Sequence, residues 1–228
     1  MSNLKQAIKQ NYVKCVQNPS YFINEFCTIQ HPQRGKIKFK LYPYQYDVLD
    51  EFEKHDYNVV LKSRQLGIST LSAAYALWMM LFHADKNVLC IATTKDTAKN
   101  LVTKVRIMYE GLPNWLKTAI VENNKLSLIF KNGSQIKAIA SNESAGRSEA
   151  LSHKTWMDAK DGVNKFNTIK LHWTDHPDRD QNWRDEQDKN LGPSKAAQEC
   201  DADFLSSGRS VVDPLILGWY KDNMCCEP

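Results

Sequence analysis

Short apolar runs alternate with longer amphipathic stretches through much of the chain. Residues 59–61 form a run typical of a buried strand, and residues 71–82 form an apolar segment long enough for a helix. Residues 87–92 predict a second buried strand, and residues 97–109 predict a second helix. Strands that alternate with helices in this way predict an α/β fold with a mainly parallel sheet.

The N-terminal pattern adds elements ahead of this core. Apolar residues recur every four positions from Leu4 to Val16, which predicts a helix, and an irregular lead-in follows to residue 30. Strict alternation over residues 36–41 predicts a strand, and residues 46–54 predict another helix.

Two apolar runs, residues 126–130 and 135–140, flank Asn132-Gly133. Asn-Gly between such runs is the strongest short signal for a β-hairpin. The next stretch, residues 144–148, is polar and predicts a flexible loop that carries Arg147, and residues 166–173 predict a further strand.

Residues 62–70 connect the first buried strand to the apolar helix. Gly67 lies in the turn, and Ser69 and Thr70 lie at the predicted start of the helix. In such an arrangement the backbone N–H groups and the helix N-terminus face an anion, and a nearby lysine supplies positive charge. We interpret this stretch as a phosphate-binding loop for a nucleotide.

The loop departs from the standard sequence, in which a lysine directly precedes Ser/Thr. Ile68 occupies that place, and the lysine of the loop is Lys62, at its beginning. A flexible lysine side chain can reach the same phosphates from there. The alternative is an ordinary strand–turn–helix unit in which Ser69 only caps the helix, and the loop by itself leaves both interpretations open.

Gln45 follows Tyr44 shortly before the loop. An aromatic ring beside a glutamine suits adenine, because the amide both donates to and accepts from the edge of the base. The alternative is that Gln45 is an exposed helix residue.

Composition places the chain among globular proteins: of its 228 residues, 42% are hydrophobic and 25% are charged, with a net charge of +4. Positive charge is concentrated in residues 1–40, which contain seven lysines and arginines and one acidic residue, Glu25, for a net charge of +6. Such an arm could lie on a nucleic-acid backbone, whereas a solvated basic face is the alternative.

The six cysteines include no C-x-x-C pair, so they predict neither a zinc site nor a disulfide framework, and reduced thiols in a cytosolic setting fit best. The N-terminus lacks the apolar core of a signal peptide, and residues 71–82 are too few to span a bilayer. We expect a soluble, intracellular protein.

Several motifs occur in one order and together resemble the large terminase subunit of tailed bacteriophages. This family is the packaging motor that pumps DNA into the procapsid, and it is similar to helicase-like P-loop ATPases. The resemblance implies a P-loop NTPase fold, with a mainly parallel sheet flanked by helices. The matching segments are Leu41-Tyr42-Pro43-Tyr44-Gln45, residues 61–70, Ala92-Thr93-Thr94-Lys95, Asn132-Gly133-Ser134 and Gly146-Arg147-Ser148.

The resemblance also implies roles for particular residues. Gln45 would read adenine, Lys62 and the loop backbone would hold the β- and γ-phosphates of ATP, and Ser69 would hold Mg²⁺. Either Arg64 or Arg147 would stabilise charge during hydrolysis, and such an arginine is worth about 10³–10⁵ in rate. The implied nucleotide-binding set is Gln45, Lys62, Ser63, Arg64, Gln65, Leu66, Gly67, Ile68, Ser69 and Thr70.

The partners implied by the resemblance are double-stranded DNA, the phage portal protein, the small terminase subunit and further copies of the same chain in a ring on the procapsid. The implied location is the cytoplasm of the bacterial host, outside the mature virion.

The chain departs from the family after Leu151. There the family continues into an apolar strand ending in Asp-Glu, where the Asp orders Mg²⁺ and the Glu activates water, and then into a strand ending in a coupling motif. Here Ser152 is followed directly by His153. Downstream, the Asp185-Glu186 pair has no apolar strand before it and predicts a solvated helix.

We therefore expect an ATPase domain with an internal stretch missing at Ser152/His153 and an incomplete central sheet. Residues 198–208 are similar to the segment leading into the family's nuclease domain, which we expect to be absent. His172, His176 and nearby aspartates have the chemistry of metal ligands, but the family resemblance implies that this region has a structural role. The expected parts are a basic lead-in (1–40), the first part of the core (41–152), its remainder (153–205) and the start of a linker (206–228).

The missing carboxylates lead us to expect weak nucleotide binding and poor hydrolysis, because loss of a general base commonly costs about 10²–10⁴ in rate. Two alternatives remain: a helicase-like ATPase unrelated to packaging, and a non-enzymatic remnant that binds neither ATP nor Mg²⁺.

Overall fold

The computed structural model describes residues 2–31, 33–141 and 145–202. Its contacts divide the chain into two compact units. The first unit comprises Met1–Asp50 and Gly67–Leu151, and the second comprises Glu51–Leu66 and Ser152–Pro228.

A four-stranded sheet forms the centre of the first unit, in the order β4-β7-β6-β5. β4 runs parallel to β7, whereas β6 is antiparallel to both β7 and β5. The turn at Asn132-Gly133 joins β6 to β7, so the predicted hairpin is confirmed. Gly133 has a φ of +83°, and a Cβ there would lie 2.0 Å from Asp85 Oδ1, so this turn requires glycine. The strands are β4 (Asn87–Ala92), β5 (Ile120–Asn123), β6 (Ser127–Phe130) and β7 (Gln135–Ala140).

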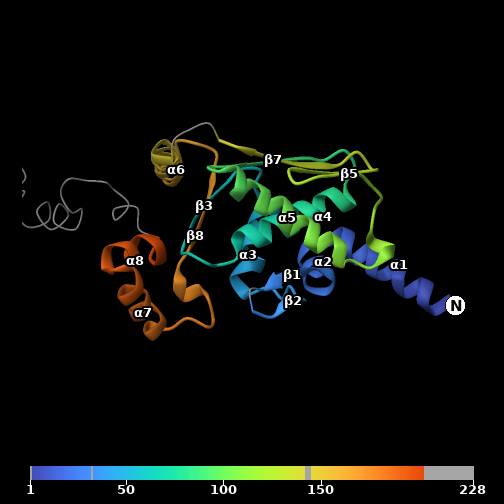
Figure 1. Cartoon of the computed structure of the whole chain (residues 1–228), viewed down its shortest axis with the longest axis horizontal. Helices are drawn as coiled ribbons and strands as arrows, with labels where there is room; N and C mark the ends of the chain where they lie inside the picture. The colour runs from blue at the N-terminus through green and yellow to red at the C-terminus, as the bar shows by residue number, and fades with distance from the viewer. Residues whose placement is uncertain (1, 32, 142–144, 203–228) are drawn as a thin grey trace, which may run out of the picture. The chain divides into compact units, whose positions relative to one another are not determined.

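Two helices, α4 (Ile68–Phe82) and α5 (Lys95–Gly111), pack against each other, and α5 covers one face of this sheet (Figure 1). Leu128, Phe130 and Ile136 are fully buried on that side, and their burial explains the apolar runs in the sequence of β6 and β7. Thr94 caps α5 by accepting from the Thr97 N–H.

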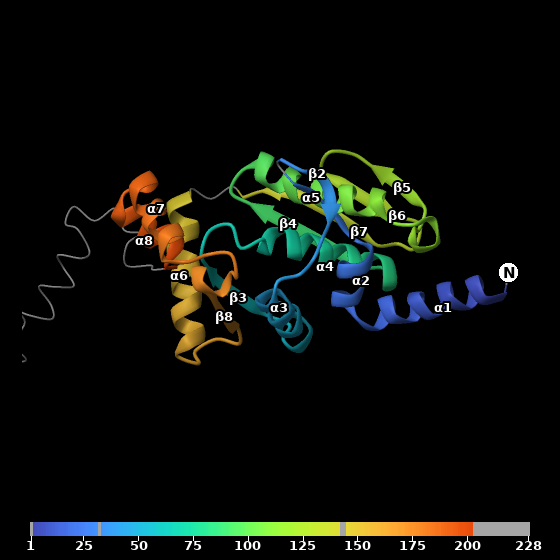
Figure 2. The same cartoon turned by 90° about the horizontal axis from the view of Figure 1, so that it is seen from below.

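The N-terminal segment is more regular than its sequence predicts. The expected helix is α1 (Ser2–Gln17), but the lead-in forms a second helix, α2 (Pro19–Phe26), and a strand, β1 (Thr28–His31). β1 pairs antiparallel with β2 (Gly35–Lys38), and α3 (Pro43–Lys54) follows. Asn18 caps α2 and Pro19 occupies its first turn, a local start signal that interrupts the preceding helix. α2 packs on α4, and α1 extends away from it toward the N-terminus (Figure 2).

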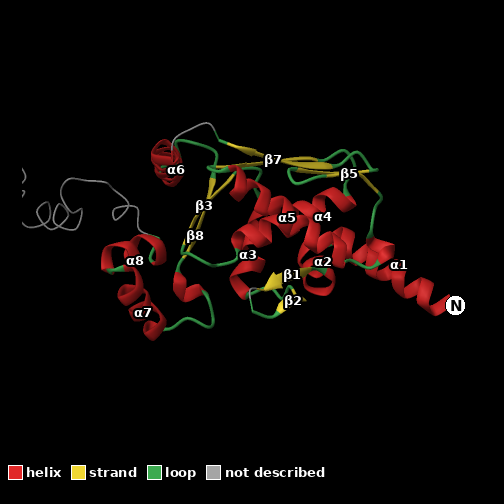
Figure 3. Ribbon diagram, viewed as in Figure 1, coloured by secondary structure: helices red, strands yellow, loops and turns green. Residues whose placement is uncertain are grey.

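In the second unit, β3 (Asn58–Lys62) pairs in parallel with β8 (Asn167–Leu171), side by side in Figure 3. A short 3-10 helix (Trp173–Asp175) follows β8 and precedes α7 (Gln181–Leu191) and α8 (Pro193–Cys200), which pack together. The Asp185-Glu186 pair lies on exposed positions of α7, as predicted for a solvated helix.

The predicted loop around Arg147 is wrong, because α6 begins at Ala145 and continues to Lys160. The helix therefore passes through the Ser152–His153 junction without a break. Ala145, Ala150 and Leu151 are strong helix formers, and their propensity outweighs the Gly and Ser residues between them.

Strands and helices alternate as an α/β fold requires, and the parallel pairs β3–β8 and β4–β7 confirm the predicted fold class. The first pair belongs to the two-stranded sheet of the second unit, and the second pair belongs to the four-stranded sheet of the first unit. None of the described helices is long and apolar enough to cross a membrane.

Candidate functional site

Lys62 is the last residue of β3 and leads into the candidate loop. The Ser63 N–H donates to the Leu171 carbonyl at 2.9 Å and so extends the pairing with β8 by one residue. The Lys62 side chain is half-buried, with Nζ 3.5 Å from the Ser63 carbonyl. Burial lowers the pKa of Lys62, with Glu199 opposing this shift and Arg179 adding to it. A partly desolvated lysine therefore lies at the start of the loop.

Two polar atoms near the start of the loop lack hydrogen-bond partners among the described residues. Ser63 is fully buried, and neither its hydroxyl nor the Nε of Arg64 has a hydrogen-bond partner among the described residues. Leaving a buried polar group unpaired costs about 1–3 kcal/mol, so such groups usually mark a place where another polar group binds.

The loop backbone turns sharply. Gln65 has a φ of +57° and Gly67 a φ of +71°, so two residues out of three are left-handed. The Arg64 N–H donates to the Glu199 carbonyl at 2.7 Å. The guanidinium of Arg179 donates to the carbonyls of Arg64 and Gln65, at 3.0 Å each.

On the helix side, the Gly67 carbonyl accepts the N–H groups of Thr70 and Leu71 and so starts α4. No side chain caps this helix, and Ser69 is exposed, so the interpretation of Ser69 as a mere helix cap is wrong. Its hydroxyl stands in the first turn of α4, where helix N-termini favour anions.

Gln45 lies beside this half of the loop. Its side chain is 2% exposed, and its Oε1 accepts the Tyr42 N–H at 3.1 Å. A Cβ at Gly67 would lie 2.9 Å from Gln45 Nε2. The interpretation of Gln45 as an exposed helix residue is therefore wrong, and glycine at position 67 leaves room for the amide.

Lys104, in α5, is a candidate site residue that the sequence analysis does not single out. Its Nζ donates to Thr70 Oγ1 at 3.1 Å, which puts a second cation near the start of α4. The two residues are 34 positions apart, and no local motif signals their contact.

The boundary between the two compact units falls between Leu66 and Gly67. The structure brings Lys62, Ser63, Arg64, Gln65 and Leu66 together in the second unit. It brings Gln45, Gly67, Ile68, Ser69 and Thr70 together in the first. Arg147 lies in α6, but its side chain is outside the described residues.

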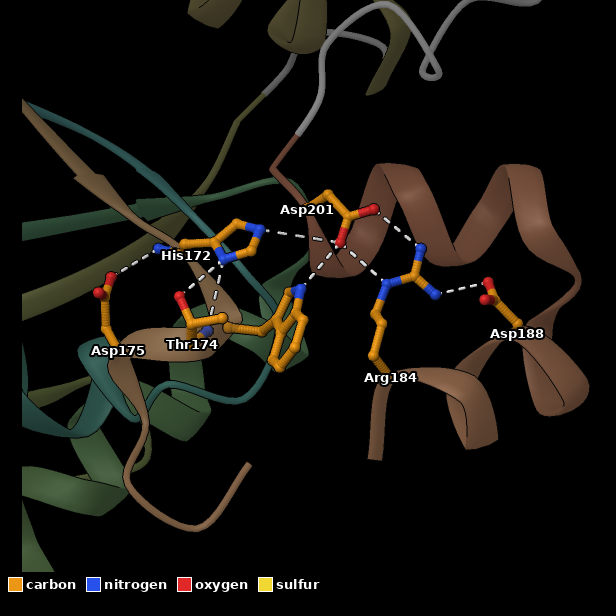
Figure 4. Close-up of polar contacts among 7 residues, drawn as sticks. His172, Thr174, Asp175, Arg184, Asp188 and Asp201 are labelled. Atoms are coloured by element: carbon orange, nitrogen blue, oxygen red, sulfur yellow. Dashed lines mark hydrogen bonds and ion pairs between the residues drawn. The ribbon is translucent and has the colours of Figure 1, made fainter. Parts of the chain in front are cut away.

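The histidine and aspartates after β8 form a separate cluster (Figure 4). Asp201 accepts from Trp173 Nε1 at 3.0 Å and from Arg184 Nε and Nη2 at 2.9 and 2.8 Å. These bonds to Arg184 lower the pKa of Asp201. Arg184 also pairs with Asp188, and Asp175 accepts the His172 N–H. Asp201 thus holds α7 to the end of α8, and Asp175 and Asp188 are occupied by local contacts. The described residues contain no group of three or more side chains suited to a metal ion.

No protein-family model matches the chain. Among solved structures, it resembles the ATPase domain of the large terminase of Thermus phage P74-26, with a TM-score of 0.50 and 15% identity over 73% of this chain and 94% of that one. It also aligns with the large terminase of bacteriophage HK97, with a TM-score of 0.45 and 16% identity over 77% of this chain. The chain spans 41% of the HK97 protein's length. The first similarity shows that the chain has the α/β fold of a terminase ATPase domain.

Proposed function

We propose that the chain is an ATP-binding motor subunit of phage DNA packaging, with the phosphates bound at residues 62–70. The observation that carries the proposal is the loop itself: it leads from a half-buried parallel strand to a helix whose N-terminus has no side-chain cap, with Lys62 at its start. The terminase-like fold supports this interpretation.

The residues present fit a nucleotide phosphate. The buried hydroxyl of Ser63 is unpaired, the left-handed turns at Gln65 and Gly67 suit a concave anion site, and Lys62 and Lys104 supply charge. ATP would supply the phosphoanhydride bond that drives translocation. Lys62 and the backbone of residues 64–69 hold its phosphates, Gln45 reads the adenine, and Arg64 or Arg147 stabilises negative charge.

The fit to Mg²⁺ is less complete. Ser69 offers one exposed hydroxyl at the helix start, and Mg²⁺ usually keeps several waters and binds through one or two carboxylates together with substrate phosphates. Ser69 therefore holds the metal only together with phosphate oxygens and water, and we infer weakened binding and poor hydrolysis.

The proposed partners are double-stranded DNA, a portal protein, a small terminase subunit and further copies of the chain in a ring. The packaging identity of the similar structures and the basic residues of the segment 1–40 support them. The proposed location is the host cytoplasm.

A non-enzymatic remnant is the second candidate. The poor fit to Mg²⁺ favours it, because Ser69 offers one exposed hydroxyl where the metal usually binds one or two carboxylates as well. A remnant would bind neither ATP nor Mg²⁺.

Mg-ATP hydrolysis by the purified chain tests the proposal, with Lys62→Ala as control. We expect slow turnover that the substitution abolishes. Turnover no higher than that of the control would refute the motor function for this chain. Stimulation by DNA without binding to a portal protein would instead indicate a helicase-like ATPase.

A further inference from the structure

Arg179 contacts the candidate loop although it lies more than a hundred residues further along the chain. Its Nη1 donates to the Arg64 carbonyl and its Nη2 to the Gln65 carbonyl, each at 3.0 Å. Both contacts lie within the second unit. One planar guanidinium thus binds two successive peptide groups, which is the geometry that an arginine fork provides and a lysine does not.

These two contacts fix the direction of the neighbouring N–H groups. In a trans peptide the C=O and the N–H of the same peptide plane point in roughly opposite directions. The Arg64 carbonyl shares its plane with the Gln65 N–H, and the Gln65 carbonyl shares its plane with the Leu66 N–H. With both carbonyls held on Arg179, both N–H groups point to the opposite side.

The backbone at Gln65 shows why such a restraint is needed. Its φ of +57° is left-handed, a conformation that a residue with a side chain adopts only when its surroundings enforce it. Successive N–H groups in such a turn form a concave nest for anions. Within the described part of the chain, the Gln65 N–H donates to no acceptor.

Arg179 is itself held in place. Its guanidinium carbon lies 4.2 Å from the ring centroid of Trp183, so stacking on α7 restricts the plane of the fork. The Glu199 carbonyl of α8 accepts the Arg64 N–H at 2.7 Å, a third contact to the loop. The bonds of Arg184 to Asp201 connect α7 to the end of α8, so the two helices that supply these groups are fixed to each other.

We infer that Arg179 is a positioning residue for phosphate binding: by holding the Arg64 and Gln65 carbonyls, it turns the Gln65 N–H group toward the bound phosphate. The inference rests on the proposed nucleotide function but concerns a residue that no loop motif includes. Arg179 needs no contact with the nucleotide for this role.

Hydrogen exchange of the nucleotide-free full chain tests the positioning step. In Arg179→Ala we expect the amides of Ser63 and Arg64, which donate to the Leu171 and Glu199 carbonyls, to exchange about tenfold faster, since each lost hydrogen bond to a charged donor is worth that much or more. Arg179→Lys keeps the charge without the fork and should give a smaller increase. Lys189→Ala, which removes an exposed charge from α7, should give none. Unchanged exchange in Arg179→Ala would overturn the inference.

Binding of a fluorescent ATP analogue tests the link to phosphate. We expect an affinity about tenfold weaker in Arg179→Ala, partly restored in Arg179→Lys, with the thermal midpoint of the wild type retained. Faster exchange with unchanged affinity would also overturn the inference. If the wild type binds no nucleotide, the proposed function fails, and the exchange experiment still decides whether Arg179 positions the loop.

Discussion

Two constraints coincide at Gly67. The backbone is left-handed there, and a Cβ would lie 2.9 Å from the amide nitrogen of Gln45. That amide is the end of a side chain, but the side chain is 2% exposed and accepts the Tyr42 N–H, so it has little room to move.

Gly67→Ala should therefore destabilise the chain by more than the backbone cost of about 1–2 kcal/mol. Gly35→Ala is a matched control, because Gly35 has a φ of +69° and nothing within 4 Å of its Cβ position. Urea denaturation measures the free energy of unfolding of both variants. Adding Gln45→Ala to Gly67→Ala should remove the extra loss of stability that Gly67→Ala shows over Gly35→Ala. Equal losses at Gly67 and Gly35 would contradict a close approach of Gln45.

Lys62 predicts a pH dependence of stability. Its pKa is lower in the folded chain than in the unfolded chain because burial disfavours the charge. The unfolded state therefore binds the proton more tightly, and the stability of the wild type relative to Lys62→Met rises as the pH rises through the lowered pKa. At neutral pH we expect Lys62→Met to be at least as stable as the wild type.

Denaturant titrations at a series of pH values measure this difference. Lys189→Met, at an exposed position on α7, supplies the baseline. Lys62→Met could instead be less stable than the wild type at neutral pH, by an amount that stays the same in alkaline conditions. That result would argue that Lys62 is not held as a desolvated cation.

At the scale of elements, the pairing of Arg184 with Asp201 holds α7 against the end of α8. Arg184 is 9% exposed, and its bonds lower the pKa of Asp201. The stabilisation is present above the unfolded pKa of about 3.9 and is lost as the pH falls through the lowered folded value.

Asp201→Asn should cost about 1–3 kcal/mol at neutral pH, because it removes one of the two charged partners of a buried guanidinium. The loss should shrink in acid, where the wild type also loses the carboxylate. Thermal unfolding at neutral and acidic pH measures both effects, with Asp185→Asn on the exposed face of α7 as control. If Asp201→Asn lowers the free energy of unfolding as much in acid as at neutral pH, the ion-pair account is wrong.

The face of the four-stranded sheet opposite α5 exposes apolar side chains. Leu89, Ile91 and Ile139 are 58%, 62% and 46% exposed, and Ile91 lies opposite Ile139 in the parallel pair. Parallel strands are usually covered on both faces. Because Leu89 and Ile91 are exposed here, Leu89→Lys and Ile91→Lys should each change the free energy of unfolding by no more than about 0.5 kcal/mol. Both substitutions should reduce the binding of an apolar dye to this face. A large destabilisation by urea would mean that this face is buried in solution.

Local patterns predicted most elements but few of the contacts at the site. Apolar runs locate β3, β4 and the hairpin because a strand pattern is encoded within a few residues. The prediction that β3 and β4 are buried is wrong: β3 is half-buried throughout, and β4 exposes Leu89 and Ile91. The strand β1 escaped prediction because its partner, β2, lies across a turn and its own pattern is too short. α6 was mistaken for a loop because Gly146 and the serines suggest one, whereas its continuation to Lys160 is set by the residues that follow.

The loop was found from its own sequence, since Lys62, Gly67 and Ser69 lie within one short stretch. Arg179 and Lys104 were not, because their contacts with the loop depend on how distant elements pack. The burial of Gln45 beside Gly67 also follows from packing and not from the sequence around it.

At the scale of the whole molecule, the parallel strands belong to two sheets instead of one. β3 and β8 form a two-stranded sheet, and β4 and β7 belong to a sheet of four. The expectation of an interrupted central sheet stays a prediction. Our central claim is the proposal that residues 62–70 bind a nucleotide phosphate without the carboxylates that hydrolysis needs.

Calorimetric titration of the full chain with Mg-ATP tests this central claim most directly. The account predicts saturable binding by the wild type and at least about tenfold weaker binding by Lys62→Ala, because a charge-assisted contact to phosphate is lost. Circular dichroism would confirm that both chains are folded. Absence of binding by the folded wild type, or an identical isotherm for Lys62→Ala, would contradict the assignment of residues 62–70 as a nucleotide site.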